Sequence, residues 1–239
     1  MSRTRRWKID RLGVVVYLAG ALGCSGGPPP LVLPAGGRPA TSAEVRVWSD
    51  SLQAGAPVLH RFKWQYRDRD QAAGGRGSAR IAGRDSLRLD MIGPLGAGRG
   101  AAFVIGAEEQ WAEPEEEVRK IAPDYQLLWA MLGIPRLPDS MDAVTRFEAP
   151  GMVAWRIVRG TDTVDFARQT GAEGRFMADV RQAGVRIGRV LTTYNADGGL
   201  KSSRLDVPRG PARLDLNYYA TSRPASFPAD TWHPPDREP

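Results

Sequence analysis

The segment HRFKWQYRD (residues 60–68) alternates apolar and polar side chains with a period of two. Phe62, Trp64 and Tyr66 share one face, while the residues between them are a lysine and a glutamine. Such alternation is typical of a β-strand with one buried and one solvated side. The same period recurs in residues 85–93, 153–157, 176–180 and 214–218. These segments predict a mainly β fold, built as a curved antiparallel sheet with one apolar face.

Three segments depart from this period and favour helices. Thr41 followed by Glu44 is a capping-box pattern, and an apolar stripe at helical spacing comes after it. Residues 121–135 carry a wide apolar helical face that ends at Gly133, and we expect residues 137–144 to add a short second turn next to it. Because a long antiparallel sheet curls or splits, we expect an open half-barrel with a lid of two or three α-helices.

The N-terminus has the pattern of a secretion signal. Residues 1–11 hold five basic residues and one acidic residue, and an uncharged run over 12–23 leads to Cys24, the only cysteine. That run is too short to span a bilayer but fits a signal-peptide core. The letters ALGC (21–24) resemble a bacterial lipoprotein box, although alanine stands where the box prefers leucine. We expect lipidation at Cys24; the alternative is an ordinary signal peptide that ends near a cysteine.

Composition divides the chain into four parts. We expect a signal peptide over 1–23, a lipidated cysteine with a Pro/Gly-rich tether over 24–40, one folded domain over 41–221 and a Pro-rich tail over 222–239. The formal charge of +6 comes mostly from the signal segment. The remaining basic residues are scattered along the sequence without an aromatic-basic motif, so we expect no binding to nucleic acid. We also expect a monomer.

The sequence holds no recognisable catalytic constellation. Its two histidines, His60 and His233, have no cysteine or carboxylate at metal-ligand spacing. The stretch GAGRGAA (96–102) resembles a dinucleotide fingerprint, but a strand-like run follows it where a helix is required. We therefore expect no enzyme, metal or cofactor. The acidic run over 108–117 is either a solvated sheet edge or a docking site for a basic partner.

Two short motifs, GPLG (93–96) and WAMLGIP (129–135), resemble those of the outer-membrane lipoprotein receptor LolB and the wider LolA/LolB-like superfamily. The second motif has one residue more than the family pattern between Trp129 and Gly133, and the C-terminal half matches only in strand rhythm. The resemblance implies a half-barrel that encloses acyl chains. Such a protein accepts lipoproteins, or other lipids, from a LolA-like periplasmic carrier and inserts them in the outer membrane.

The resemblance also assigns roles to residues. Leu95, presented by Pro94 and Gly96 on a protruding turn, would dip into lipid; alternatively, it folds back onto the sheet. The candidates for the acyl-cavity wall are Trp64, Leu89, Trp129, Leu132 and Trp155. The alternative for each of them is ordinary core packing.

The expected location is the periplasmic face of the outer membrane. Ser25 follows the lipidated cysteine, whereas an aspartate at that position retains lipoproteins in the inner membrane of well-studied bacteria. Two other functions remain open at this point. One is an envelope-stress sensor or regulatory lipoprotein on the same fold, and the other is a structural envelope lipoprotein without a cavity.

Overall fold

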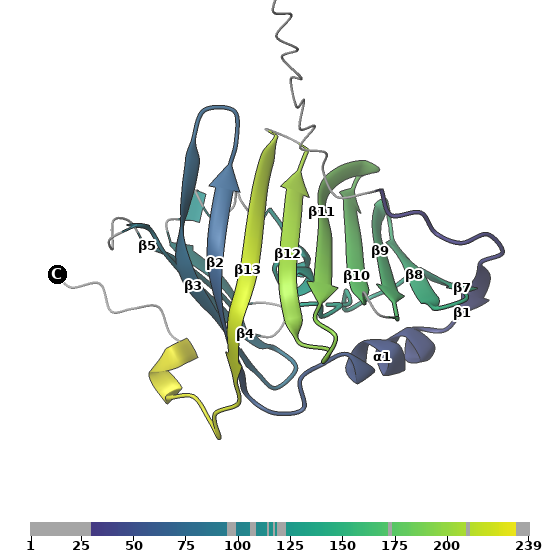
Figure 1. The fold of residues 1–239 in the computed structure, drawn as a ribbon. Coiled ribbons are helices and arrows are strands. Elements are labelled where there is room, and N and C mark those ends of the chain that lie inside the picture. The colour runs from purple at the N-terminus through teal and green to yellow at the C-terminus, as the bar shows by residue number, and fades with distance from the viewer. Residues whose placement is uncertain are drawn as a thin grey trace, which may run out of the picture.

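The computed structural model describes residues 30–94, 99–105, 109–113, 115–116, 118, 123–171, 174–208 and 211–232. These residues form one antiparallel sheet of thirteen strands. Figure 1 shows the strands lying side by side. The strands are β1 (Arg38–Ala40), β2 (Val58–Arg67), β3 (Ala72–Ala82), β4 (Ser86–Ile92), β5 (Arg99–Ile105), β6 (Glu109–Glu113), β7 (Ala143–Ala149), β8 (Met152–Arg159), β9 (Asp162–Gln169), β10 (Arg175–Gln182), β11 (Val185–Tyr194), β12 (Leu200–Val207) and β13 (Ala212–Ser222).

The sheet consists of two meanders that meet in its middle. Its order is β1-β7-β8-β9-β10-β11-β12-β13-β2-β3-β4-β5-β6. The meanders join where β13 pairs with β2, with Leu216 opposite Trp64. Within the described residues β1 and β6 each pair with a single neighbour, so the sheet is open. The predicted mainly β, open antiparallel architecture is confirmed.

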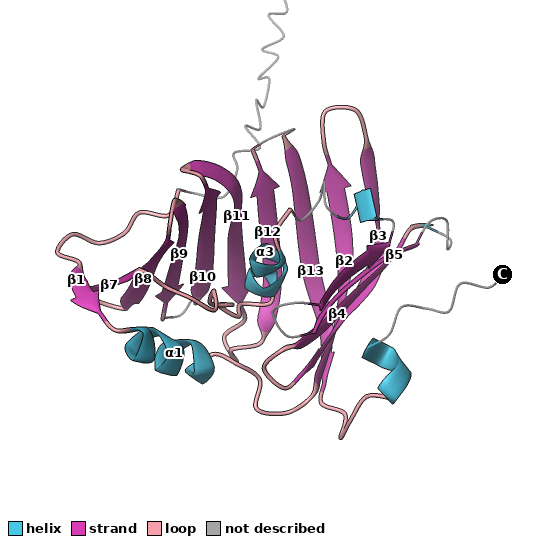
Figure 2. Ribbon diagram, turned by 180° about the vertical axis from the view of Figure 1, so that it is seen from behind, coloured by secondary structure: helices cyan, strands magenta, loops and turns pink. Residues whose placement is uncertain are grey.

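Two α-helices with defined bounds accompany the sheet. The capping box forms as predicted at the start of α1 (Ser42–Ser51), where Thr41 and Glu44 bond reciprocally. The second, α3 (Tyr125–Met131), lies on the inner side of β11 and β12 (Figure 2). Single helical residues also occur at 115, 116 and 118, so the expected count of two or three is approximate.

The short helical turn expected over 137–144 is wrong. The segment is irregular, with bends at residues 139 and 142, and β7 begins inside it at Ala143. The backbone N–H of Asp142 donates to the carbonyl of Val158 at 2.8 Å, which prolongs the β7–β8 ladder. Its side chain accepts from the Gly160 N–H at 2.6 Å. Strand pairing therefore occupies the backbone N–H of Asp142, which a helix would have used for its own hydrogen bonds.

The core lies between the inner face of the sheet and the two helices. One cluster of buried side chains runs through both meanders and includes Val45 of α1 and Leu127 of α3. Trp48 of α1 packs against Trp155 of β8, with ring centroids 5.8 Å apart. The alternation read from the sequence thus places the apolar residues on the inner side.

On the outer face, charges form a row across neighbouring strands. Arg156 stands opposite Asp165, Asp165 opposite Asp179, and Asp179 opposite Arg189. Asp165 and Asp179 are only 3% and 1% exposed. The opposite-charge pairs stabilise the sheet, and Arg181 binds both of the like charges that face each other, Asp165 and Asp179. Arginines that are scattered along the sequence are therefore ordered by strand register into a row that they share with two aspartates.

The ends of the predicted domain fall close to elements of the sheet. Strand β1 lies in the segment expected to be a tether and pairs with β7. After β13, the 3-10 helix η2 (Ala229–Trp232) contacts β4, and the carbonyl of Thr231 accepts from Arg88 Nη1 at 2.9 Å. No helix among the described residues has the length and hydropathy needed to cross a membrane. The signal segment and Cys24 lie outside the described residues.

Candidate functional site

The structure brings the five predicted wall residues into the same hydrophobic cluster. They come from both meanders of the sheet and from α3. Each is at most 9% exposed: Trp64 on β2, Leu89 on β4, Trp155 on β8, Trp129 on α3 and Leu132 at its C-cap. Their common inner face is thus established. Their contact with a lipid stays a prediction.

A group of glycines in β3 shapes the wall around Trp64. The Trp64 Nε1–H donates to the carbonyls of Arg76 and Ile92, at 3.1 and 3.3 Å. A Cβ atom at Gly75 would overlap the Ile92 carbonyl oxygen, and one at Gly77 would overlap the Phe62 ring. Because β3 lacks side chains here, the two aromatic rings lie across it. The sequence analysis missed this feature, although the run AAGGRG contains the signal.

Helix α3 is fixed to the floor of the half-barrel at its C-terminal end. Gly133 has a φ of +73°, and the N–H of Ile134 bonds to the Trp129 carbonyl at 3.2 Å, as in a Schellman motif. The carbonyl of Met131 then accepts hydrogen bonds from three hydroxyls on adjacent strands: Thr192 Oγ1 of β11, Ser203 Oγ of β12 and Tyr218 Oη of β13.

This buried hydroxyl cluster satisfies a helix end that would otherwise carry unpaired carbonyls. Burial raises the pKa of Tyr218, so its hydroxyl remains a donor at all ordinary pH values. The sequence analysis did not single out these residues. In the sequence, these residues are recognisable as polar side chains at positions where the period-two alternation predicts apolar ones.

Two buried donors in the apolar cluster lack a partner. The indole N–H groups of Trp129 and Trp155 reach no acceptor in the part of the chain that the structure describes. An unpaired buried donor costs about 1–3 kcal/mol. A ligand that carries carbonyl groups, such as a fatty-acid ester, could satisfy such donors.

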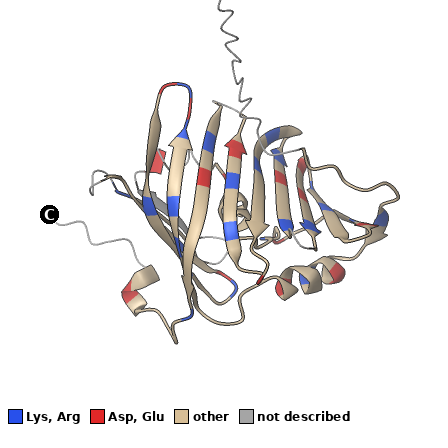
Figure 3. Cartoon of the chain, in the orientation of Figure 1, with Lys and Arg blue, Asp and Glu red and all other residues tan. Residues whose placement is uncertain are grey.

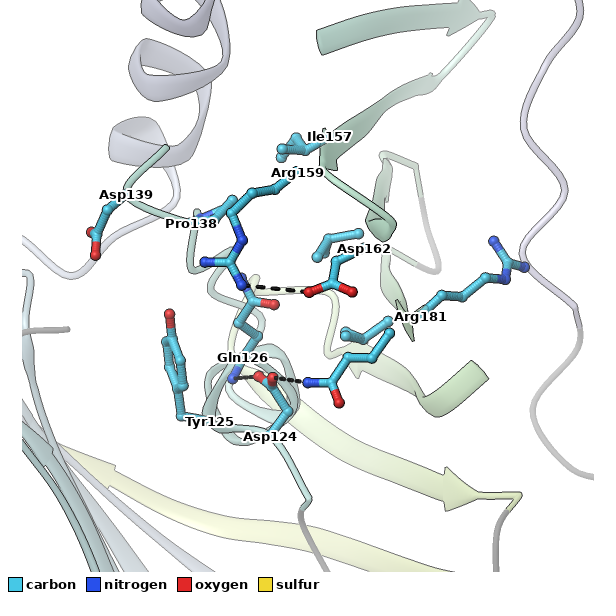
Figure 4. A pocket seen from close by; sticks show the side chains of 12 residues that line it. Asp124, Tyr125, Gln126, Pro138, Asp139, Ile157, Arg159, Asp162 and Arg181 are labelled. Atoms are coloured by element: carbon cyan, nitrogen blue, oxygen red, sulfur yellow. Dashed lines mark hydrogen bonds and ion pairs between the residues drawn. The ribbon is translucent and has the colours of Figure 1, made fainter. Parts of the chain in front are cut away.

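A cavity of about 190 Å³ opens beside the N-terminal end of α3. Figure 4 shows its lining residues converging from α3, from the loop after it and from the ends of β8, β9 and β10. The apolar side chains of Ile157, Val164 and Val180 contribute to a lining that is otherwise mostly polar and charged. Arg159 and Asp162 stand at the rim and form an ion pair at 3.5 Å. The cavity thus places charged and polar side chains next to a few apolar ones.

Asp124 closes one side of this cavity. As the N-cap of α3, its carboxylate accepts from the backbone N–H of Gln126 at 2.7 Å and from Gln182 Nε2 at 3.3 Å. Burial raises the pKa of Asp124, while the hydrogen bond from Gln126 opposes the shift. The carboxylate thereby links α3 to the end of β10.

The predicted insertion turn is only partly visible. Pro94 is exposed, and Ile92 just before it is 43% exposed. Leu95 and Gly96 lie outside the described residues. Of the acidic run over 108–117, the structure describes the backbone of β6 and residues 115 and 116.

The histidine and acidic residues show no metal-binding arrangement in the described ranges. His60 Nδ1 lies 2.9 Å from the Thr221 hydroxyl. Burial, aided by the positive charge of Arg223, lowers the pKa of His60 to about 4. His233 lies outside the described residues.

Comparisons with known proteins give low similarity throughout. No family model matches the chain, and no curated protein matches it. A structure of an outer membrane lipoprotein-sorting protein domain from Vibrio parahaemolyticus is 10% identical, with 80% of this chain and 95% of that chain covered and a TM-score of 0.36. A LolA superfamily protein from Nitrosomonas europaea is 8% identical, with coverage of 82% and 98% and a TM-score of 0.35.

A DUF1329 family protein from Desulfovibrio piger is 8% identical over 80% of this chain and 95% of that chain, with a TM-score of 0.31. Likeness at this level assigns neither a family nor an activity to this chain. The class defined by its own residues is an open antiparallel half-barrel with an apolar inner face and a helix fixed against that face. The LolB-like role stays a prediction.

Proposed function

We propose that this protein binds acyl chains on the inner face of its half-barrel, without catalytic chemistry or a cofactor. In this account it is an outer-membrane lipoprotein, anchored through Cys24 and facing the periplasm. It accepts lipoproteins or other lipids from a LolA-like periplasmic carrier and passes them to the membrane. The observation that carries the proposal is the cavity beside α3, whose lining joins Ile157, Val164 and Val180 of the apolar cluster to charged side chains such as Arg159 and Asp162.

The energetics favour an acyl ligand. Each buried methylene contributes about 0.8 kcal/mol, so a chain of about fifteen methylenes gains on the order of 12 kcal/mol before any costs. The cavity described is smaller than such a chain, so we treat it as the entrance to the apolar cluster behind it. The unpaired N–H groups of Trp129 and Trp155 lie in that cluster and support a ligand with ester or amide carbonyls.

Delivery needs a route from this face to the bilayer. We propose that Leu95, next to the exposed Pro94, enters the lipid as the cargo leaves. Burial of one leucine side chain contributes roughly 1.5–3 kcal/mol. The GPLG motif and the lipoprotein signal at Cys24 support this role.

A cavity-filling variant tests the binding site. Val180→Phe adds a ring to the lining of the cavity. Val185→Phe adds the same ring at a position that is 42% exposed. We expect Val180→Phe to weaken displacement of a fluorescent fatty acid at least tenfold, with the Val185 variant equal to the wild type. Thermal unfolding confirms that both variants are folded. Equal binding by the two folded variants would place the ligand elsewhere.

Transfer is tested separately from binding. Leu95→Glu should retain a loaded acylated peptide but release it to phospholipid vesicles more slowly than the wild type. Leu95→Met, which keeps an apolar tip, is the matched control. If the glutamate variant transfers cargo as fast as the methionine variant, the tip has no role in delivery.

A structural envelope lipoprotein with a filled core is the second candidate. The observation in its favour is that all five wall residues are already buried among protein side chains. Lipid extraction from the purified protein separates the two functions. Stoichiometric fatty acid or phospholipid supports the acyl-binding function, and its absence, together with a failure to bind added lipid, supports the structural one.

A further inference from the structure

We propose that the outer face of β2 to β5 docks on an anionic phospholipid surface. Four exposed side chains define this face and form the basic row: Lys63 of β2, Arg76 of β3, Ile92 of β4 and Arg99 of β5. They stand directly opposite one another in strand register, Lys63 with Arg76, Arg76 with Ile92, and Ile92 with Arg99. Neighbouring strands are about 4.8 Å apart, so the row spans roughly 15 Å.

The charge of this row is not neutralised by the sheet. Across the described ranges, no acidic side chain forms an ion pair with Lys63, Arg76 or Arg99. The contrast with the other meander is plain, because Asp165 and Asp179 bind arginines there. Figure 3 shows blue bands without red ones along β2, whereas β12 and β13 carry both colours.

On the β2 side, the surroundings of the row add to its positive charge, whereas β6, beyond Arg99, is acidic in sequence. Arg61 and Arg67 are exposed on the same face of β2. The nearest carboxylate on β4, Asp90, is held by Arg80 and by Arg88 Nε, the latter at 2.9 Å. Asp90 is thus occupied within its own cluster. The face therefore presents exposed cations on β2, β3 and β5.

Ile92 distinguishes a membrane from other anionic partners. It is 43% exposed at the centre of the basic row, and the exposed Pro94 follows it. An apolar side chain between cations gains free energy at a lipid interface, where headgroup charge and acyl chains lie close together. It gains nothing on a polyanion without an apolar layer. The inference concerns the outer face and does not depend on acyl binding inside the half-barrel.

Vesicle co-sedimentation tests the proposal with the full chain. Cys24→Ala removes any attached lipid, so that only the protein surface can bind. The probes are vesicles of phosphatidylcholine alone and vesicles in which a quarter of the lipid is phosphatidylglycerol. We expect binding to the anionic vesicles only. Raising the salt to about 1 M, where the Debye length is about 3 Å, should abolish it.

Charge-removal variants locate the surface. A cation close to an anionic membrane contributes about 1 kcal/mol, which is about fivefold in affinity. The double variant Lys63→Gln/Arg76→Gln should therefore bind the anionic vesicles roughly 25-fold more weakly. The matched control Arg46→Gln/Lys201→Gln also removes two exposed cations, from α1 and β12, and should bind as the parent does. Equal weakening of both doubles would overturn the proposal.

The isoleucine provides the second arm. Ile92→Ser should weaken binding to anionic vesicles about three- to tenfold, because part of the transfer free energy of an isoleucine is lost. It should leave binding to soluble polyglutamate unchanged. If the parent binds polyglutamate but not the anionic vesicles, the row serves an acidic protein and the membrane proposal is wrong. Acyl-peptide binding is measured on the same variants and should stay unchanged. Failure of the membrane-docking proposal can therefore be told apart from failure of the acyl-binding function.

Discussion

Replacement of Gly133 by alanine tests how α3 is seated on the sheet. Gly133 ends the helix with a φ of +73°, a conformation that costs an ordinary residue about 1–2 kcal/mol. A Cβ atom there would also overlap the Tyr194 hydroxyl and lie 3.0 Å from its ring carbon Cζ. Tyr194 cannot move freely, because the Arg168 guanidinium lies over its ring at 3.9 Å. Overpacking of this kind costs about 1–3 kcal/mol.

Together the two costs give a loss of about 2–5 kcal/mol in the free energy of unfolding of Gly133→Ala. At 2–4 °C per kcal/mol for a domain of this size, the melting temperature should fall by roughly 4–20 °C. Gly198→Ala is the control for backbone strain alone, because Gly198 has a φ of +81° and open space around its missing Cβ. Gly198→Ala should lower the free energy of unfolding by only about 1–2 kcal/mol.

A double variant separates the two causes. Tyr194→Phe removes the hydroxyl that the new methyl group would meet, so Gly133→Ala should cost less in that background than in the wild type. The measurement is thermal unfolding followed by circular dichroism. If Gly133→Ala and Gly198→Ala are equally stable and Tyr194→Phe brings no rescue, α3 does not rest against β11 as described.

Three further predictions concern stability. Burial keeps His60 neutral with a pKa of about 4, so on acidification the unfolded chain binds a proton before the folded chain does. Lowering the pH from 6.5 to 4 should therefore reduce the free energy of unfolding by up to about 3 kcal/mol. In urea titrations, His60→Gln should lack this contribution to the pH dependence. Asp179→Asn leaves Arg186 and Arg189 without their carboxylate and should lower the free energy of unfolding by about 3–5 kcal/mol; a loss below 1 kcal/mol would contradict the role of the outer charge row. Tyr218→Phe removes one donor to the Met131 carbonyl and should cost about 1 kcal/mol, measured in the same titrations, and an unchanged midpoint would show that the bond contributes nothing.

Local patterns were sufficient to predict the elements. The alternation of Phe62, Trp64 and Tyr66 predicted a strand with one buried face, and β2 has that burial. The Thr41–Glu44 capping box predicted the start of α1. Each of these signals depends on residues within one turn or one strand. Such signals are complete in the sequence because no distant partner is needed to form them.

Long-range features could not be predicted in the same way. The pairing of β13 with β2 joins residues about 150 positions apart, and no local pattern fixes their register. The outer charge row depends on that kind of register, as does the hydroxyl cluster below α3. Thr192 and Ser203 look like interruptions of an apolar pattern until the C-terminal carbonyls of α3 supply their partners.

The residues of the inner face were predicted more fully than their role in ligand binding. The five wall residues do share one face, since the period-two pattern and the helical face of α3 both point inward. Burial alone does not separate a wall residue from a core residue. The two unpaired indole N–H groups and the cavity beside α3 are visible only once the strands are assembled.

The central claim is that this half-barrel binds acyl chains, and one titration tests it most directly. The purified chain, stripped of bound lipid, is titrated with a triacylated lipopeptide and with the same peptide lacking its acyl chains. The account predicts micromolar or tighter binding of the acylated peptide, close to −8 kcal/mol or better, and no measurable binding of its twin. Equal binding of the two peptides, or of neither, would contradict the account and leave a half-barrel with a filled core.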